Sequence, residues 1–163
     1  MTAQATIRPA VASDLDRLLQ LGEARRRQYA EYQPVFWRPA ADAADHQRPY
    51  LATLIEDDAV ITVVADTGGT LAGFAVGMIV AAPPVYDPGG PTCLIDDFAV
   101  AVAEQWPTVG VELLGALRRT ARERGAAQVV VVCGHLDGPK RTALEHSGLS
   151  IASEWWVAPL GST

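Results

Sequence analysis

The spacing of hydrophobic positions changes along the chain, and the changes predict a series of short strands and amphipathic helices. A β-like run ends at residues 7–9. A helix is expected from Ser13, which has the side chain of an N-cap residue, because Leu15, Leu18 and Leu19 follow at helical spacing. The chain is therefore expected to open with a strand and then a helix.

The segment after these leucines is harder to assign. Three arginines, residues 25–27, are expected to form a solvated last turn of the first helix rather than an anion site. From Tyr29 to Pro39 aromatic residues are mixed with prolines, which predicts a loop. Its rings either lie near a pocket or cap the core. A second helix is expected over residues 42–57.

The middle of the chain has the pattern of three β-strands. Residues 60–65 and 70–80 are apolar and rich in β-branched side chains, and they flank a Gly-Gly turn, which predicts a hairpin. Residues 93–100 form a third strand pattern with two carboxylates, Asp96 and Asp97, at its middle. Paired carboxylates inside an apolar strand are unusual, so they are candidate functional residues.

Helices and strands continue to alternate towards the C-terminus. Val109, Leu113, Leu117 and Ala121 recur at four-residue spacing, which predicts an amphipathic helix. A fully buried strand, a short helix and a last strand are expected over residues 129–133, 139–147 and 151–157. The predicted order is β-α-α-β-β-β-α-β-α-β, which is an α/β (α+β) fold.

Length and composition agree with a single globular domain over residues 1–163. The chain has 163 residues, 49% hydrophobic and 20% charged, which excludes a disordered chain or a fibrous repeat. Its longest apolar stretch, residues 71–82, contains glycines and is shorter than the roughly 20 residues of a membrane span. No secretory signal is visible at the N-terminus, so a cytoplasmic location is expected, with no membrane partner.

Charge and cysteine usage exclude two further classes of protein. The formal net charge of −6 repels a phosphate backbone, so nucleic acid is not expected as a partner. Cys93 and Cys133 lie in apolar runs and form neither a C-x-x-C pair nor a metal cluster. Buried reduced thiols and no metal site are expected.

A candidate anion site lies before the amphipathic helix, since amides at a helix N-terminus suit a diphosphate. The segment is Gln105-Trp106-Pro107-Thr108-Val109-Gly110; without the element order, a stiff turn that starts a helix is the favoured interpretation. With the element order, it resembles the acetyl-CoA loop R/Q-x-x-G-x-G/A of the GCN5-related N-acetyltransferase (GNAT) family. The resemblance covers residues 7–157 and implies a GNAT-like mixed, mostly antiparallel central sheet with helices on both faces.

The resemblance also implies acetyl-CoA as the acyl donor. Its pantetheine would run along Phe98, Ala99 and Val100. Its pyrophosphate would meet the amides around Gln105, Thr108, Val109, Gly110 and Val111. Two residues depart from the family pattern, because Thr108 replaces a glycine and Pro107 has no N–H to offer.

Acetyl transfer to an amine needs a group that takes a proton from the ammonium. The segment Ile95-Asp96-Asp97-Phe98-Ala99-Val100 resembles the acidic strand of polyamine-acetylating members of the family, where Asp96 falls on the base. Strand alternation places Asp96 and Asp97 on opposite faces of the sheet, so only one of them can point into a given site. For either residue, a structural carboxylate held by arginine or backbone is the alternative.

The last helix departs from the family pattern at the general acid. Asp137-Gly138-Pro139-Lys140 follows the family's Asn-x-x-Ala segment imperfectly, and Leu144 stands where the family has a tyrosine. His135 is a candidate substitute because imidazole titrates near neutrality; the alternative is a surface histidine. Of the two rings of Trp155 and Trp156, one is expected in the core, and the other is expected to contact the acceptor pocket or a second copy in a homodimer.

Together these features predict an acetyl-CoA-dependent N-acetyltransferase. The acceptor is the primary amine of a small cationic molecule, and the amine attacks the thioester directly. One alternative is a non-catalytic acyl-CoA-binding or protein-interaction module on the same fold. Another is acylation of a protein N-terminus or lysine, which requires an open groove.

Overall fold

A mixed five-stranded sheet forms the centre of the protein. The computed structural model describes residues 4–161. Its strands lie in the order β1-β2-β3-β4-β5; β1 to β4 pair antiparallel, and β4 pairs parallel with β5. The strands are β1 (Thr6–Pro9), β2 (Val60–Asp66), β3 (Leu71–Val80), β4 (Thr92–Val100) and β5 (Gln128–Val131). The predicted mostly antiparallel sheet is confirmed.

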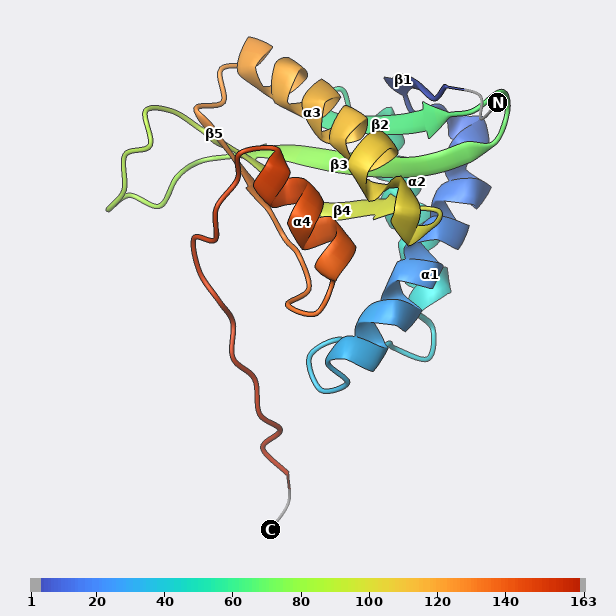
Figure 1. The fold of residues 1–163 in the computed structure, drawn as a ribbon, viewed down its shortest axis with the longest axis vertical. Helices are drawn as coiled ribbons and strands as arrows, with labels where there is room; N and C mark the ends of the chain where they lie inside the picture. Colours follow the sequence, from blue (N-terminus) through green and yellow to red (C-terminus); the bar gives the residue numbers. More distant parts are fainter. Residues whose placement is uncertain (1–3, 162–163) are drawn as a thin grey trace.

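Helices cover both faces of this sheet (Figure 1). On one face lie α1 (Leu15–Tyr32) and α2 (Ala43–Glu56), and on the other lie α3 (Val111–Glu123) and α4 (Gly138–His146). A short 3-10 turn, Ala12–Asp14, precedes α1. No helix within residues 4–161 has both the length and the apolar character to cross a membrane.

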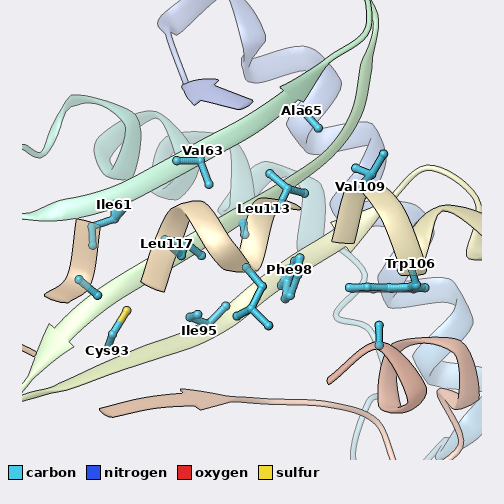
Figure 2. Packing of buried hydrophobic residues seen from close by; sticks show 14 of the residues in the cluster. Ile61, Val63, Ala65, Cys93, Ile95, Phe98, Trp106, Val109, Leu113 and Leu117 are labelled. Atoms are coloured by element: carbon cyan, nitrogen blue, oxygen red, sulfur yellow. The ribbon is translucent and has the colours of Figure 1, made fainter. Parts of the chain in front are cut away.

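Each face of the sheet has its own hydrophobic core. Figure 2 shows the core beneath α3, where Leu113 and Leu117 pack over Ile95 and Phe98 of β4. The opposite core joins α1 and α2 to the other face of β2 and β3. Both cores reach β4, so the carboxyl end of this strand is held between two packed layers.

The first helix differs from its prediction at both ends. Asp14, rather than Ser13, satisfies the amide at the helix entry: its carboxylate accepts a 2.8 Å hydrogen bond from the Val11 N–H. At the other end α1 continues to Tyr32, so Tyr29 is a buried helical residue and not part of a loop. The arrangement carries Arg25 and Tyr29 towards the end of β4.

A β-bulge interrupts β4 at the two carboxylates. Ile95 pairs with Gly77 and Phe98 pairs with Ala75, so Asp96 and Asp97 together oppose the single residue Val76. In a bulge two residues face one, and the regular alternation of side chains stops. The sequence pattern does not reveal a bulge, because the extra residue is defined only by the partner strand.

The C-terminal segment contradicts the prediction of a last strand. Residues 149–161 form no strand, and Trp155 and Trp156 are 82% and 89% exposed, so neither ring lies in the core. A strand needs a neighbouring edge for its hydrogen bonds, and the segment runs away from the sheet instead (Figure 1). For the same reason β5 is an edge strand with alternating exposed and half-buried residues, not the fully buried strand expected over 129–133.

Candidate functional site

A cavity of about 200 Å³ lies between α1 and the carboxyl end of β4. The pairing of β4 with β5 ends where the Val132 N–H donates to the Ile95 carbonyl at 2.9 Å. Beyond this point Phe98, Ala99 and Val100 continue along β4 and line the cavity. The strand segment assigned to pantetheine by resemblance thus borders an open space.

The two carboxylates of β4 meet one arginine. Arg25 of α1 forms ion pairs with Asp96 (3.3 Å) and Asp97 (3.7 Å). The prediction that the carboxylates lie on opposite faces is therefore wrong, because the bulge turns both towards α1. Arg25 also corrects the prediction of a solvated arginine run, since its side chain is only 15% exposed and stacks over the Tyr29 ring.

The two carboxylates differ in environment. Burial raises the pKa of Asp97 above the ordinary aspartate value, and the Arg25 charge opposes this shift. Asp96 is more open, with 57% of its side chain exposed. A carboxylate with a raised pKa is a better proton acceptor than an ordinary one, so Asp97 has the more suitable environment for a base.

A buried hydrogen-bond network joins α1 to the segment before α4. The Tyr29 hydroxyl donates to Asp137 at 2.8 Å and accepts from the Gly134 N–H at 3.2 Å. Asp137 also caps α4 by accepting from the Lys140 N–H. Both Tyr29 and Asp137 line the cavity, and burial raises the pKa of Tyr29, which keeps its hydroxyl protonated.

His135 lies outside this network. It is exposed, its Nδ1 lies 3.2 Å from Arg141, and its carbonyl accepts from the same guanidinium. Its side chain does not line the cavity.

The segment predicted as a phosphate loop is helical. Residues Ala103–Gln105 form a 3-10 turn and Trp106–Gly110 a π turn, both continuous with α3. Pro107 favours this, because its fixed φ suits a first helical turn. The Val111 N–H is used inside the turn, where it donates to the carbonyls of Trp106 and Thr108.

The residues expected to contact pyrophosphate therefore lie in helical turns and not in an open loop. Thr108 is exposed and donates from its hydroxyl to the Gln105 carbonyl. Val109 and Gly110 are buried, and the Trp106 ring packs directly on Gly110. A side chain at position 110 would meet the Trp106 ring, so the close packing of this ring requires glycine here.

A shallow groove between the start of α3 and α4 lies on the other side of Trp106. Its walls include Gly110, Val111, Leu144 and Ser147. Phe98 and Trp106 line both the groove and the cavity, and their rings meet edge to face at 4.8 Å (Figure 2). These two rings form the partition between the two spaces.

Sequence reasoning did not place Arg25 or Asp137 at the cavity wall, and it left Tyr29 as a loop residue either near a pocket or capping the core. Arg25 and Tyr29 follow Leu21 at intervals of four, so helical periodicity extended past the arginine run would have found them. Asp137 is a helix cap by sequence. Its bond to Tyr29, 108 residues away, had no sequence signal.

The family follows from comparison of the sequence with known families. Residues 22–144 match the model of the Acetyltransferase (GNAT) family. The protein belongs to this family. An acetyltransferase is thus confirmed as the enzyme class of the chain, and the predicted resemblance is correct.

Solved acetyltransferase structures share the fold. The structure of a predicted acetyltransferase with acetyl-CoA from Clostridium acetobutylicum has 18% identity and a TM-score of 0.71, covering 96% of this chain and 97% of its own. A GCN5-related N-acetyltransferase from Ralstonia eutropha has 20% identity and a TM-score of 0.73, covering 96% and 99%.

A third similar structure has a stated substrate class in its name. It is an aminoglycoside N-acetyltransferase in complex with CoA, with 15% identity, a TM-score of 0.68, and coverage of 96% of this chain and 94% of its own. No curated protein matches the sequence. No group of three or more histidine, cysteine, aspartate or glutamate side chains within residues 4–161 is placed to hold a metal ion.

Proposed function

We propose that this protein transfers the acetyl group of acetyl-CoA to the primary amine of a small cationic acceptor by direct attack. The cavity between α1 and the end of β4 is the observation that carries the proposal. Its volume of about 200 Å³ suits a small amine rather than a folded polypeptide. The Clostridium and aminoglycoside acetyltransferase structures, which contain acetyl-CoA and CoA, support the same donor here.

The charges around the cavity suit a cationic acceptor. Asp137 and Arg25 line the cavity, and Asp96 and Asp97 lie beside it as ion-pair partners of Arg25. Three carboxylates therefore face one guanidinium and the buried Lys140 amine. A net negative wall attracts an ammonium group. Asp97, whose pKa is raised by burial, then takes the proton that the amine must lose before it attacks.

The leaving CoA thiolate also needs a proton. The Tyr29 hydroxyl lies in the cavity wall and stays protonated, because burial raises its pKa. His135 is the earlier candidate, but its side chain faces Arg141. The raised pKa also makes Tyr29 a weak acid, and its hydroxyl already donates to Asp137, so we assign neither residue as the proton donor and the thiolate takes its proton from water.

One observation favours the alternative of a non-catalytic acyl-CoA-binding module. Arg25 already pairs with both carboxylates, so neither of them is free to act as a base. In such a module the donor binds and no acetyl group is transferred. Binding and CoA release, measured on the same sample, separate the two functions.

Calorimetric titration with acetyl-CoA tests the donor site. We expect dissociation constants on the order of micromolar for the natural chain. We place the pyrophosphate of acetyl-CoA in the groove between α3 and α4, whose walls include Gly110 and Val111, and its pantetheine along Phe98. Ser147→Phe places a ring in this groove, and we expect binding to weaken by roughly tenfold or more because the added volume must be accommodated.

His146→Phe is the matched control. His146 is the residue next to Ser147, and its side chain is exposed and does not line the groove. Equal binding by both variants would contradict the donor site. Release of CoA in the presence of a linear diamine then tests transfer. Binding without release supports the non-catalytic module.

We propose further that the C-terminal segment joins two copies in a homodimer. Ile151, Trp155, Trp156 and Leu160 are 62 to 101% exposed, a large apolar surface for a monomer. The outer edge of β5 has no strand partner within residues 4–161, so an extended segment from a second copy can pair with it. The same edge in both copies makes the exchange symmetric.

Light scattering of the full chain and of a chain ending at Ser150 tests this exchange. We expect a dimer for the full chain and a monomer for the shortened one. A full chain that is monomeric at high micromolar concentration would contradict the homodimer. Trp155→Ser with Trp156→Ser is the second variant, expected to weaken the dimer without removing backbone.

A further inference from the structure

A buried lysine occupies the place where β4 and β5 separate. Lys140 of α4 is 0% exposed, and its Nζ donates to the carbonyl oxygens of Phe98 (3.3 Å) and Val132 (2.9 Å). The rings of Phe98 and Trp106 lie 5.1 and 5.3 Å from the same Nζ. The amine therefore lies against the partition between the groove and the cavity.

Lys140 has no ordinary structural explanation. It is the single lysine among the 13 lysines and arginines of the chain, so solvent-exposed positive charge is supplied by arginine throughout. No carboxylate within residues 4–161 forms an ion pair with it. A fully buried ammonium held only by two carbonyls and two rings is an unfavourable arrangement, and such groups concentrate at functional sites.

The environment of Lys140 favours the neutral amine. Burial, with a smaller contribution from the Arg25 charge, lowers its pKa to about 8. About a tenth of the amine is then unprotonated at pH 7, and this fraction is nucleophilic without a separate base. The charged and titratable groups that face it from α1, β4 and the segment before α4 are Arg25, Asp96, Asp97, Cys133 and Asp137.

We propose that Lys140 is acetylated by the acetyl-CoA that this protein itself binds. The inference rests on the proposed function, which places the acyl donor along Phe98, the residue whose carbonyl Lys140 contacts. The unprotonated Nζ attacks the thioester carbonyl, an N–C bond forms and the C–S bond breaks. The proton lost by the nitrogen ends on the CoA thiolate, which leaves as free CoA.

Acetylation removes the buried charge. An amide keeps one N–H, so it can satisfy one of the two carbonyls but not both, and it has no positive charge to desolvate. The modified side chain is larger than the amine and lies against the rings of Phe98 and Trp106. Lys140 is thus an acceptor within the partition, distinct from the small amine in the cavity.

Mass spectrometry of the full chain tests the proposal directly. The protein is incubated with acetyl-CoA and no added amine, and we expect the gain of one acetyl group on the peptide that contains Lys140. Ser147→Phe should slow the gain by tenfold or more and His146→Phe should not, if the donor arrives by the groove. The natural chain can already carry an acetyl group on Lys140 when it is purified from its expression host. This result supports the proposal only if the Ser147→Phe variant purified from the same host lacks the acetyl group.

Three results would overturn the inference. If calorimetry shows acetyl-CoA binding while Lys140 stays unmodified, the self-acetylation is wrong and the proposed function stands. If acetyl-CoA does not bind, both are wrong. If the chain unfolded in denaturant is acetylated at Lys140 as fast as the folded chain, the transfer is ordinary solution chemistry. Lys140→Arg, which cannot take the group in this way, should show no gain.

Discussion

Asp137→Ala should lower the free energy of unfolding by about 3 to 5 kcal/mol. The substitution leaves the buried Tyr29 hydroxyl without its acceptor and removes the cap of α4. It also removes the nearest carboxylate on the segment that carries the buried Lys140. Urea unfolding at neutral pH, followed by circular dichroism, measures the loss.

Asp137→Asn is the matched control, because its amide keeps one oxygen acceptor at the same place. We expect it to lose less than half as much stability as the alanine variant. Tyr29→Phe should cost about 1 to 2 kcal/mol, and combining it with Asp137→Ala should cost less than the sum of the single variants, since the two residues share one hydrogen bond. A loss below about 1 kcal/mol for Asp137→Ala would show that the network contributes little.

Arg25→Met should reduce acetyl transfer at neutral pH by roughly ten- to a hundredfold. Arg25 is the cation paired with both Asp96 and Asp97, and its charge holds down a pKa that burial raises. Without this charge Asp97 is protonated to a higher pH and is less available as a base. CoA release with a linear diamine as acceptor measures the effect.

The pH profile gives the sign of this effect. A base acts in its unprotonated form, so the acidic limb of kcat/KM should move to higher pH in Arg25→Met. The free energy of unfolding also depends on the protonation of Asp97. Because its pKa is raised in the folded state, the contribution of Asp97 to this free energy is most favourable below the unfolded-state pKa and is lost as pH rises through the folded-state pKa. This loss should be larger in the variant.

Arg27→Met is the control for the loss of one positive charge on α1. Its side chain is 70% exposed, and within residues 4–161 its one ion pair is with Glu23 on the same helix. We expect an unchanged pH profile and nearly unchanged activity. If Arg25→Met matches Arg27→Met in both, Asp97 is not the base.

The helices and central strands could be predicted because they depend on local periodicity. The hairpin of β2 and β3 has two continuous apolar runs around a Gly-Gly turn, and α3 has an apolar repeat of about four residues; both lie within a few residues of their predicted bounds. The two β4 carboxylates were also visible as polar residues in an apolar strand. The last strand failed because a strand's stability depends on an edge to pair with, which no local pattern specifies.

By itself, the sequence determined the order of the elements from the first strand to α4, since hydrophobic pattern and turn residues act locally, and its resemblance to the acetyltransferase family implied the mostly antiparallel sheet. Only the tertiary structure decided which side chains meet. The β4 bulge turned both carboxylates to Arg25, and α1 brought Tyr29 to Asp137. Lys140 became a buried amine because α4 packs over the gap between β4 and β5. Such contacts join residues far apart in the chain, and their geometry depends on how all the elements pack together.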